Sequence, residues 1–280
     1  MSASPAWVAL SLVEHLGAVK MRLLLDHFGD LDAVLNADAR ALRQVPGIGP
    51  KISESIVNMD ARQIAEALPR WQAAGVRILT SSDPLYPRRL SDLEDAPPTL
   101  FARGTLCAPD QRAVAVVGTR TPSPEAIDAA QRISYGLAAR GIVVVSGLAL
   151  GVDTAAHLGA LAARDGCTLA VLGSGVLNIY PPANRALGQA ILQRGALVSE
   201  TAPGAGPKPS SLVARNRLIS GLSEALIVIE TREDGGAMHA ARFAQKQGRR
   251  VYALDYGASG NQALLADGAR PISADLDGFA

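Results

Sequence analysis

Cysteine, aromatic side chains and net charge are all scarce in this sequence of 280 residues. The two cysteines, Cys107 and Cys167, are too few for a disulfide-rich secreted scaffold, and we expect both to be reduced structural thiols. Aromatic residues make up only 4%, so a bound nucleic acid would find few rings on which to stack its bases. The formal net charge of +1 excludes a global attraction for polyanions, and any such binding must come from local clusters.

The sequence also shows no pattern typical of a targeting segment or a membrane span. No stretch approaches the roughly 20 apolar residues of a membrane span. Residues 1–13 lack the basic start and the long apolar run of a signal peptide. We therefore expect a soluble, cytoplasmic protein with no membrane partner. Its hydrophobic content of 48% over 280 residues is sufficient for two packed domains.

Signatures of catalysis are absent as well. The four histidines are scattered and the two cysteines lie far apart, so we expect no metal site. The sequence has no Gly-x-Ser-x-Gly elbow and no Walker loop, and no dinucleotide fingerprint follows the first strand of the βαβ unit described next. We therefore expect no cofactor and no enzymatic activity, and we predict a surface that binds phosphate without breaking a bond.

The stretch from 113 to 157 organises the chain. Its β-branched run at 114–117 ends in a glycine and predicts a buried strand. A helix is expected to begin after the cap residue Ser123, because a proline and then an acid follow it, and to end at Gly141. A second buried strand is expected at 142–145. Together these elements predict a βαβ unit.

Strands and helices alternate through the rest of the chain after residue 75. Further strands are expected at 76–80, 100–102, 168–172, 196–199, 225–230, 251–254 and 271–272, and helices include 210–222 and 235–247. This alternation predicts an α/β fold with a doubly wound, mostly parallel sheet. Residues 1–75 show only helical patterns and predict a small all-α domain. We place the domain boundary near residue 75, so that 76–280 form the sheet domain and 76–110 its lead-in of strands and loops.

The helical domain contains a tight turn, VPGIGPK at 45–51, which leads into a helix. This turn resembles a helix-hairpin-helix motif, whose glycine amides hold a DNA phosphate without reading the sequence. On that interpretation Gly47, Gly49 and Lys51 are auxiliary DNA contacts. The alternative is a packing or partner-binding module without a phosphate site, and the sequence leaves both open.

Four stretches of the sheet domain are expected to meet beyond the carboxyl ends of the strands, at 118–120, 146–153, 173–180 and 215–217. Small-residue loops that open helices aim backbone N–H groups at one spot, and arginine forks suit phosphate oxygens. We therefore predict an anion site in which three arginines share one groove. Its expected members are Gly118, Thr119, Arg120, Ser146, Gly147, Gly173, Gly175, Arg215, Asn216 and Arg217.

Two further polar residues stand near these loops. Asp153 is expected either to cap the helix that follows it or to orient a nearby arginine or contact a sugar or base. His157 lies one helical turn later. We interpret this lone histidine as a packed or solvated helix residue rather than as a catalyst.

Several motifs taken together resemble one family. They are VGTR (117–120), SGLALGVDTAAH (146–157), LGSGVLNIYPPANRAL (172–187), LVSE (197–200) and ARNRLISGLSEALIVIE (214–230), with the lead-in segments DPLYPRRL and PPTLFARGTL. This set resembles the DprA/Smf DNA-processing proteins over essentially the whole chain. The resemblance implies an extended Rossmann fold that forms homodimers, binds and protects single-stranded DNA, and loads the recombinase RecA onto it during natural transformation. It also implies a DNA backbone held by Gly118, Arg120, Ser146, Gly147, Arg215, Asn216 and Arg217.

The sequence departs from the family pattern in three places. The family commonly has a Gly-Ser-Leu-x-Thr-Ala type loop where this chain has Gly235–Ala240. It usually has Val-Pro-Gly where this chain has Leu254–Tyr256, and many members carry a C-terminal winged helix that this sequence does not contain.

Two other classes of function compete with this interpretation. The loop at 234–236 is similar to the glycine motif of LOG-type nucleotide phosphoribohydrolases, but the threonine of that motif falls on His239 and its catalytic glutamate on Arg242. Release of free base from nucleoside monophosphates would identify such an enzyme. The third class is a structural or partner-docking protein with empty glycine loops, which would leave labelled oligo-dT unbound.

Overall fold

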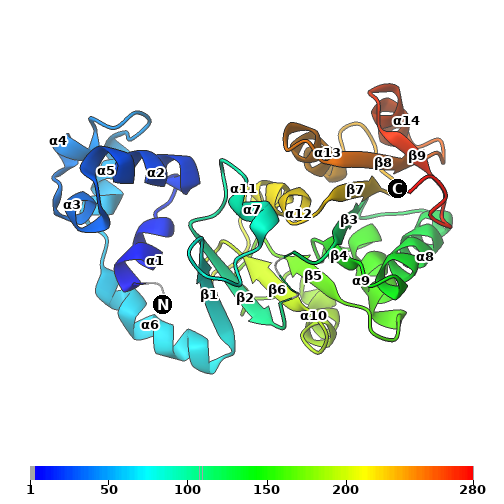
Figure 1. Cartoon of the computed structure of the whole chain (residues 1–280), viewed down its shortest axis with the longest axis horizontal. Helices are drawn as coiled ribbons and strands as arrows, with labels where there is room; N and C mark the ends of the chain where they lie inside the picture. The colour runs from blue at the N-terminus through cyan, green and yellow to red at the C-terminus, as the bar shows by residue number, and fades with distance from the viewer. Residues whose placement is uncertain (1–3, 107, 109, 280) are drawn as a thin grey trace.

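The computed structural model describes residues 4–106, 108 and 110–279. Within this part of the chain, nine strands form one sheet in the order β1-β2-β6-β5-β4-β3-β7-β8-β9. The edge strands β1 and β2 are antiparallel, whereas the strands from β6 across to β9 run parallel (Figure 1). Their bounds are β1 Val76–Thr80, β2 Thr99–Gly104, β3 Ala113–Val117, β4 Val143–Ser146, β5 Thr168–Val171, β6 Ala196–Ser199, β7 Ala225–Val228, β8 Arg250–Leu254 and β9 Arg270–Ile272.

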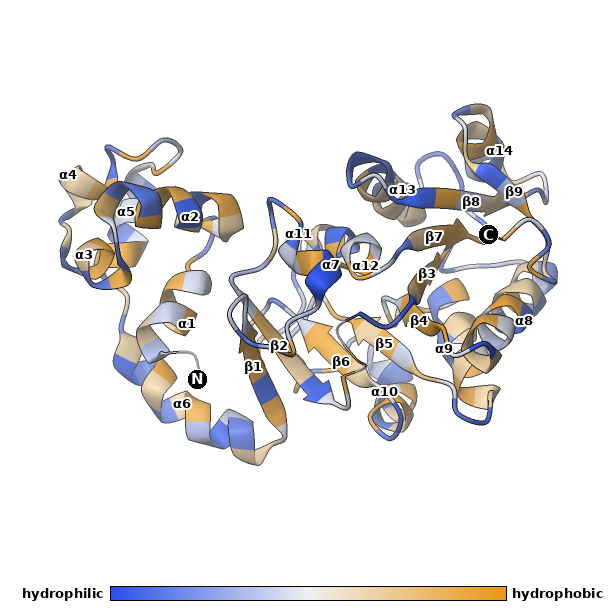
Figure 2. Cartoon of the chain, in the orientation of Figure 1, coloured by the Kyte–Doolittle hydropathy of each residue, from blue (hydrophilic) through white to orange (hydrophobic). Residues whose placement is uncertain are grey.

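Helices cover both faces of the sheet. On one face α8 (Pro124–Ala139) and α9 (Val152–Ala162) pack on Val114 and Val116 of β3. On the other face the neighbouring residues of β3 pack against α7, α12, α13 and α14. Because alternate side chains of a strand point to opposite faces, both sets are buried, and Figure 2 shows the central strands as mostly hydrophobic. The predicted doubly wound sheet is confirmed. The remaining bounds here are η1 Pro182–Asn184, α7 Arg88–Ser91, α10 Arg185–Ile191, α11 Pro209–Ala214, α12 Asn216–Gly221, α13 Gly236–Lys246 and α14 Ser259–Ala266.

The first part of the chain is helical, as predicted. It contains α1 Pro5–Ser11, α2 Gly17–Phe28, α3 Leu31–Asn36, α4 Ala39–Leu42, α5 Pro50–Val57 and α6 Ala61–Ala73. Helices α2 to α5 lie apart from the sheet and pack on a separate core, to which Leu10 of α1 also belongs (Figure 1). In contrast, Val8 of α1 and Trp71 of α6 pack into the cluster around Phe101 of β2. The boundary near residue 75 falls between α6 and β1, and the division into two domains stays a prediction.

Two local predictions are wrong. The proline-rich lead-in contains the short helix α7, which begins directly after Pro87 and is too brief to leave a periodic pattern in the sequence. The helix expected over 210–222 is interrupted at Arg215, so that α11 and α12 are separate. The interruption coincides with the side chain that is drawn into the edge of the sheet, as described below.

The expectation of a reduced thiol is also wrong for Cys167, which is disulfide-bonded. The other cysteine, Cys107, lies outside the described residues.

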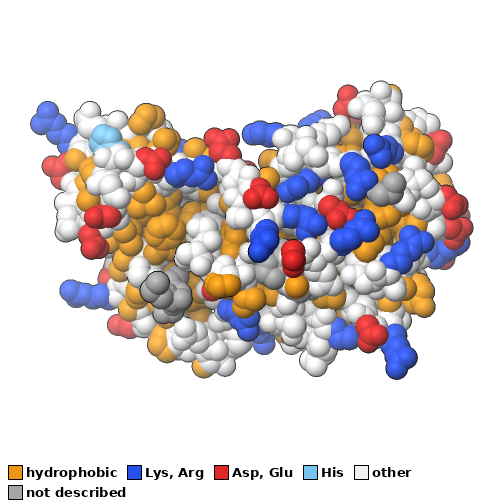
Figure 3. Space-filling view, in the orientation of Figure 1, with side chains coloured by type: hydrophobic (Ala, Val, Ile, Leu, Met, Phe, Trp, Pro, Cys, Tyr) orange, Lys and Arg blue, Asp and Glu red, His pale blue; other side chains and the backbone are white. Residues whose placement is uncertain are grey.

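The surface differs between the two parts of the molecule. In the view of Figure 3, hydrophobic side chains gather over the helical part at the left, whereas Lys and Arg side chains gather over α7 and the middle of the sheet part. Among the described helices, none combines the length and the apolar character that crossing a bilayer requires.

Candidate functional site

A crevice of 620 Å³ opens at the carboxyl edge of the sheet, between the loops that follow β3 and β7. These strands are parallel neighbours, but α8 after β3 and α13 after β7 pack on opposite faces. Open α/β sheets bind ligands at such a topological switch point. The walls are formed by residues 117–121, Ala149, Asp153, residues 209–219 in part, and residues 231–240 in part.

Arg120 is an exposed cation of this crevice. It lies in the loop that follows β3, and none of the described carboxylates forms an ion pair with it. Its charge acts on Arg215 and helps to lower the pKa of that buried side chain. Two guanidinium groups thus act on one another, and of the two, Arg215 is the one with an acidic partner among the described residues. An anion bound in the crevice would relieve this repulsion.

The start of α13 forms another wall. Gly235 is the N-cap and supplies no side-chain hydrogen bond, and Gly236, Ala237 and His239 line the crevice. The first amides of a helix are orphan donors at the positive end of its dipole, so this wall also favours an anion. From the sequence, Gly235–Ala240 was expected to be a departure from the family pattern, and the loop at 234–236 a weak match to the LOG-type glycine motif, but neither was expected in the anion site. The rule that adjacent parallel strands end at one edge would have placed this segment in the site.

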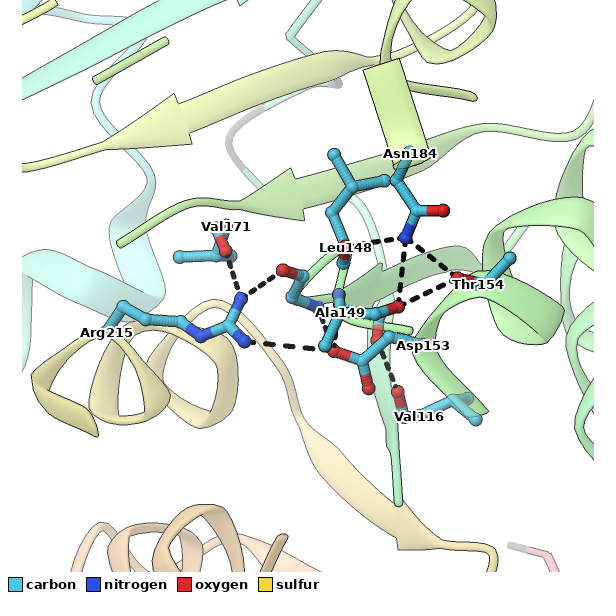
Figure 4. A network of polar contacts seen from close by, with 10 residues as sticks. Val116, Leu148, Ala149, Asp153, Thr154, Val171, Asn184 and Arg215 are labelled. Carbon is cyan, nitrogen blue, oxygen red and sulfur yellow. Dashed lines mark hydrogen bonds and ion pairs between the residues drawn. The ribbon is translucent and has the colours of Figure 1, made fainter. Parts of the chain in front are cut away.

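Arg215 lines the crevice, but little of its side chain reaches the surface. It is only 6% exposed, and its Nη1 donates to the carbonyl of Gly147 and, at 2.6 Å, to that of Val171 (Figure 4). Its Nη2 lies 3.8 Å from Oδ2 of Asp153. Burial lowers the pKa of Arg215, Asp153 opposes this shift, and Arg120 adds to it. The side chain therefore braces the loops that follow β4 and β5.

Asp153 completes this brace. Its Oδ2 accepts from the amide of Gly147 at 3.1 Å and from that of Ala149 at 3.2 Å. Burial raises the pKa of Asp153, and Arg215 together with these hydrogen bonds opposes the rise. The carboxylate thus holds loop amides that precede α9 and faces an arginine. This is the arrangement of an orienting residue.

The loop groups that the sequence suggested for phosphate are used inside the protein. The amide of Gly147 donates to Asp153, that of Gly175 to the carbonyl of Ala205 at 2.9 Å, and that of Thr119 to the carbonyl of Glu230 at 2.7 Å. The hydroxyl of Ser146 is buried and donates to the carbonyl of Val116. The prediction of unpaired amides at these positions is therefore wrong, because the sheet edge itself needs their hydrogen bonds.

The glycines have a packing role in these loops. A Cβ on Gly118 would lie 2.5 Å from Val152, and one on Gly173 would lie 2.8 Å from the backbone of Leu212. At Gly147 the same position would overlap the guanidinium of Arg215. Each glycine thus permits a close approach of two segments, and Ser146, Gly147, Gly173 and Gly175 do not line the crevice.

Arg217 is turned elsewhere. Its Nη2 pairs with Glu200 and its Nη1 donates to the carbonyl of Asp95 at 2.9 Å. The expectation that three arginines share one groove is thus wrong for Arg217, whereas Arg120 and Arg215 both line the crevice. The physical reason is helical geometry, since residues i and i+2 point in different directions. Of the predicted set, those that line the crevice are Gly118, Thr119, Arg120, Asp153, Arg215 and Asn216.

Two buried asparagines support the site and were missed by sequence analysis. Nδ2 of Asn184 donates to the carbonyl of Leu148 at 2.9 Å and to Oγ1 of Thr154 at 2.8 Å (Figure 4). Asn261 accepts from the amide of Thr231 at 2.8 Å and donates to the carbonyl of Leu254. Each fastens a loop of the crevice from below. Single asparagines leave no periodic signal, and only the fold reveals these contacts.

The predicted hairpin in the helical part is present. Gly47 has a φ of 82°, a conformation that favours glycine, and Gly49 is the N-cap of α5. Lys51 is exposed in the first turn of that helix. Nearby, Lys208 hydrogen-bonds to Glu14 at 3.2 Å and is the main cause of the lowered pKa of Glu14, to which Lys51 also contributes. The hairpin and the segment before α11 therefore lie close together.

His157 is a buried side chain of α9, which matches its interpretation as a packed residue. Its Nδ1 lies 2.7 Å from Oγ1 of Thr168, whose hydroxyl donates to Val144, so Nδ1 is the protonated nitrogen. Among the described residues its buried Nε2 has no partner. Burial, and to a lesser degree Arg215, lowers the pKa of His157 to about 3.

This shift predicts a pH-dependent stability. The pKa of His157 is about 3 in the folded chain and about 6.5 in the unfolded chain. Between these two pH values the imidazole is protonated in the unfolded chain and neutral in the folded chain. The contribution of His157 is therefore complete above about pH 6.5 and declines as the pH falls. In His157→Gln we expect a smaller loss of unfolding free energy on going from neutral to mildly acid pH, measured by urea denaturation. An identical pH dependence in both proteins would refute this assignment.

Comparisons with known proteins agree with this architecture. Residues 77–277 match the family described as DNA recombination-mediator protein A, and residues 6–66 match a helix-hairpin-helix motif. Protein Smf of Synechocystis is 37% identical over 256 residues, which are 89% of this chain and 63% of that protein. DNA processing protein DprA of Streptococcus pneumoniae is 38% identical over 200 residues, which are 70% of each chain.

Solved structures show the same likeness. The X-ray structure of the Streptococcus pneumoniae protein superposes with a TM-score of 0.82 at 28% identity and covers 99% of this chain and 97% of that one. A structure of DNA processing protein A from Helicobacter pylori gives a TM-score of 0.64 at 30% identity, over 73% of this chain and 93% of that one. With its sheet, its switch-point crevice and these matches, the chain belongs to the DNA recombination-mediator protein A family, the DprA/Smf proteins.

Proposed function

We propose that this protein binds single-stranded DNA by its phosphate backbone in the switch-point crevice, without reading base sequence. The observation that carries the proposal is Arg120, an exposed arginine with no acidic partner among the described residues, in the same crevice as the uncapped start of α13. The solved structure of the Helicobacter pylori relative gives insights into the single-stranded DNA binding mode of that protein, which supports the choice of ligand. The low aromatic content of 4% places the affinity on phosphates rather than on stacked bases.

The residues of the site take different roles in this proposal. Thr119, Arg120, Asn216 and the first turn of α13 contact the strand. The buried Arg215 acts as a positioning residue, together with Asp153 and the glycines that let the loops approach. Arg217 anchors α12 through its ion pair with Glu200.

Family membership supports a wider role. We propose that the protein acts as a homodimer in the cytoplasm, protects incoming single-stranded DNA during natural transformation, and delivers it to RecA. These assignments rest on the family alone. A pull-down of RecA on strands preloaded with this protein, and light scattering of the free protein, would test them.

We propose no bond-breaking step in the crevice. Both described carboxylates that line it are engaged, Asp153 with Arg215 and Asp234 with Arg232 at 2.7 Å. In a LOG-type enzyme a free glutamate would be expected on the helix where this chain has Arg242. Incubation with nucleoside monophosphates is therefore expected to release no free base, and release would favour the competing class.

The helix-hairpin-helix turn is proposed as an auxiliary contact through Gly47, Gly49 and Lys51. Lys51→Gln removes one exposed cation beside an uncapped helix start. Because exposed phosphate contacts are individually weak, we expect a loss of affinity of only about two- to fivefold for a long strand. Binding to a strand too short to reach the hairpin should not change. An equal loss for both lengths would contradict this placement.

The experiment that tests the proposal compares labelled oligo-dT, a mixed-sequence single strand and the corresponding duplex. We expect the two single strands to bind with similar affinity and the duplex to bind at least about tenfold more weakly, because a duplex is too wide and stiff to follow the crevice. Strong preference for one base composition would require direct readout and would contradict the proposal.

A further inference from the structure

A second group of arginines lies at the opposite edge of the sheet, where the parallel strands begin. We call it the amino-edge cluster: Arg89 on α7, Arg112 before β3, Arg140 after α8 and Arg249 before β8. In Figure 3, which looks onto α7, Lys and Arg side chains gather around that helix. The crevice lies beyond the other ends of the same strands.

This cluster carries more positive charge than its contacts neutralise. Among the described residues, the acid that forms ion pairs within it is Glu224, whose Oε1 lies 2.7 Å from Arg112 and whose Oε2 lies 3.3 Å from Arg89. The carboxylate of Glu224 is thus shared between two cations, and its side chain is only 17% exposed. Like charges this close favour the arrival of an external anion.

Arg249 extends the imbalance. Its Nη2 donates to the carbonyl of Arg89 at 3.1 Å, and its buried Nε has no partner among the described residues. Burial lowers the pKa of Arg249, the neighbouring charge of Arg89 lowers it further, and Asp92 opposes both effects. The cluster therefore contains a guanidinium that is incompletely satisfied by the protein.

The cluster is accessible from solvent. The Arg112 side chain is 56% exposed, and Arg140 is exposed as well. Together they line a cavity of 340 Å³, and the other described residues of its walls, Gly141, Ile142 and Phe279, carry no side-chain carboxylate. An anionic group can therefore reach both arginines.

We propose that the amino-edge cluster binds the phosphate backbone of a second nucleic-acid strand. The proposal rests on the proposed function, in which the first strand occupies the crevice. The two sites are separated by the five residues of β3, roughly 17 Å at 3.3–3.4 Å per residue, so one phosphate cannot reach both. Each protomer would then hold two strands on opposite edges of one sheet.

The chemistry of the walls favours nucleic acid over an acidic protein. Protein interfaces are centred on aromatic and apolar anchors, whereas nucleic-acid interfaces are polar and strongly positive. Here Ile142 is buried, and the ring centroids of Phe279 and Tyr252 lie 5.3 Å apart, so that the two rings pack together. Neither apolar side chain is therefore free to anchor a protein partner. The groups left for a ligand are guanidinium forks, which match phosphate oxygens.

The test is a two-strand capture assay with the full chain. The protein is bound to a dense layer of immobilised oligo-dT, so that both crevices of a homodimer are occupied, washed, and then offered a second, fluorescent oligo-dT, which cannot pair with the first. The double variant Arg112→Gln with Arg140→Gln removes the two exposed forks and leaves Glu224 paired with Arg89. The control is Arg62→Gln with Arg70→Gln, which removes two exposed charges from α6.

We expect the wild type and the control to capture the second strand, and the Arg112/Arg140 variant to capture about tenfold less while it still binds the first strand normally. Equal capture by that variant would overturn the proposal, since it would assign both strands to the two crevices of a homodimer. The wild type is also assayed with inorganic phosphate at the same concentration of phosphate groups as the second strand supplies. If this inorganic phosphate abolished capture of the second strand, the cluster would be a site for small anions instead. If the wild type binds the first strand and captures no second, this inference alone fails, whereas failure to bind the first strand refutes the proposed function too.

Discussion

Replacement of Arg120 by alanine is expected to weaken binding of single-stranded DNA roughly 10- to 100-fold, because a charge-assisted hydrogen bond to phosphate contributes about 1.5–3 kcal/mol. The effect should be the same for every base sequence, since a phosphate contact carries no sequence information. Fluorescence anisotropy with oligo-dT and with mixed-sequence strands measures both quantities.

The matched control for this experiment is Arg62→Ala, which removes an exposed arginine from α6, away from the crevice. We expect its affinity to stay near that of the wild type. The account would be contradicted if Arg120→Ala bound as tightly as Arg62→Ala, or if it changed the preference among bases.

The second large effect is expected for Asp153→Asn. The substitution leaves Arg215 buried without its acidic partner, and breaking one side of a buried pair typically costs about 3–5 kcal/mol. Urea denaturation should show this as a reduced unfolding free energy, and the loops after β4 and β5 should lose protection from hydrogen exchange.

A control with the same chemical change is Asp128→Asn. Asp128 lies 3.6 Å from Arg132 on the surface of α8, where exposed ion pairs contribute little. Its unfolding midpoint should remain close to that of the wild type. If Asp153→Asn were equally mild, Arg215 would not depend on this carboxylate, and the brace described here would be wrong.

Much of the fold could be predicted because local signals agree with one another. The β-branched runs of β3 and β4 are bounded by glycines, and Ser123 caps α8 by accepting from the amide of Ala126 at 3.2 Å, as its sequence context indicated. Alternation of such strands with helices admits few topologies, so the doubly wound sheet followed. Elements without a pattern of their own, such as the four residues of α7, did not.

The site was predicted less completely, for a different physical reason. A sequence shows that Arg215 and Arg217 are two residues apart in a helical segment. It does not show which carbonyl groups or carboxylates lie close enough to bind each side chain. The structure directs one to Gly147 and Val171 inside the sheet edge and the other to Glu200. Similarly, the small-residue loops were correctly placed at the carboxyl edge of the sheet. Their amides, however, donate hydrogen bonds within the protein, as the amide of Gly147 does to Asp153, and such partners depend on tertiary structure.

Long-range partners set the remaining limit. Asn184 and Asn261 hold loops in place from positions 30 residues away in sequence. The start of α13 enters the crevice only because β7 pairs with β3. These contacts are properties of the sheet as a whole, whereas the motifs are properties of single segments.

The most direct test of the central claim is the salt dependence of binding to oligo-dT. If the strand is held by phosphates, the logarithm of the binding constant should fall linearly with the logarithm of salt concentration, by about 0.7 for each phosphate neutralised. Arg120→Ala should reduce that slope by about the same amount. A binding constant that does not change with salt, or an unchanged slope in the variant, would contradict the account.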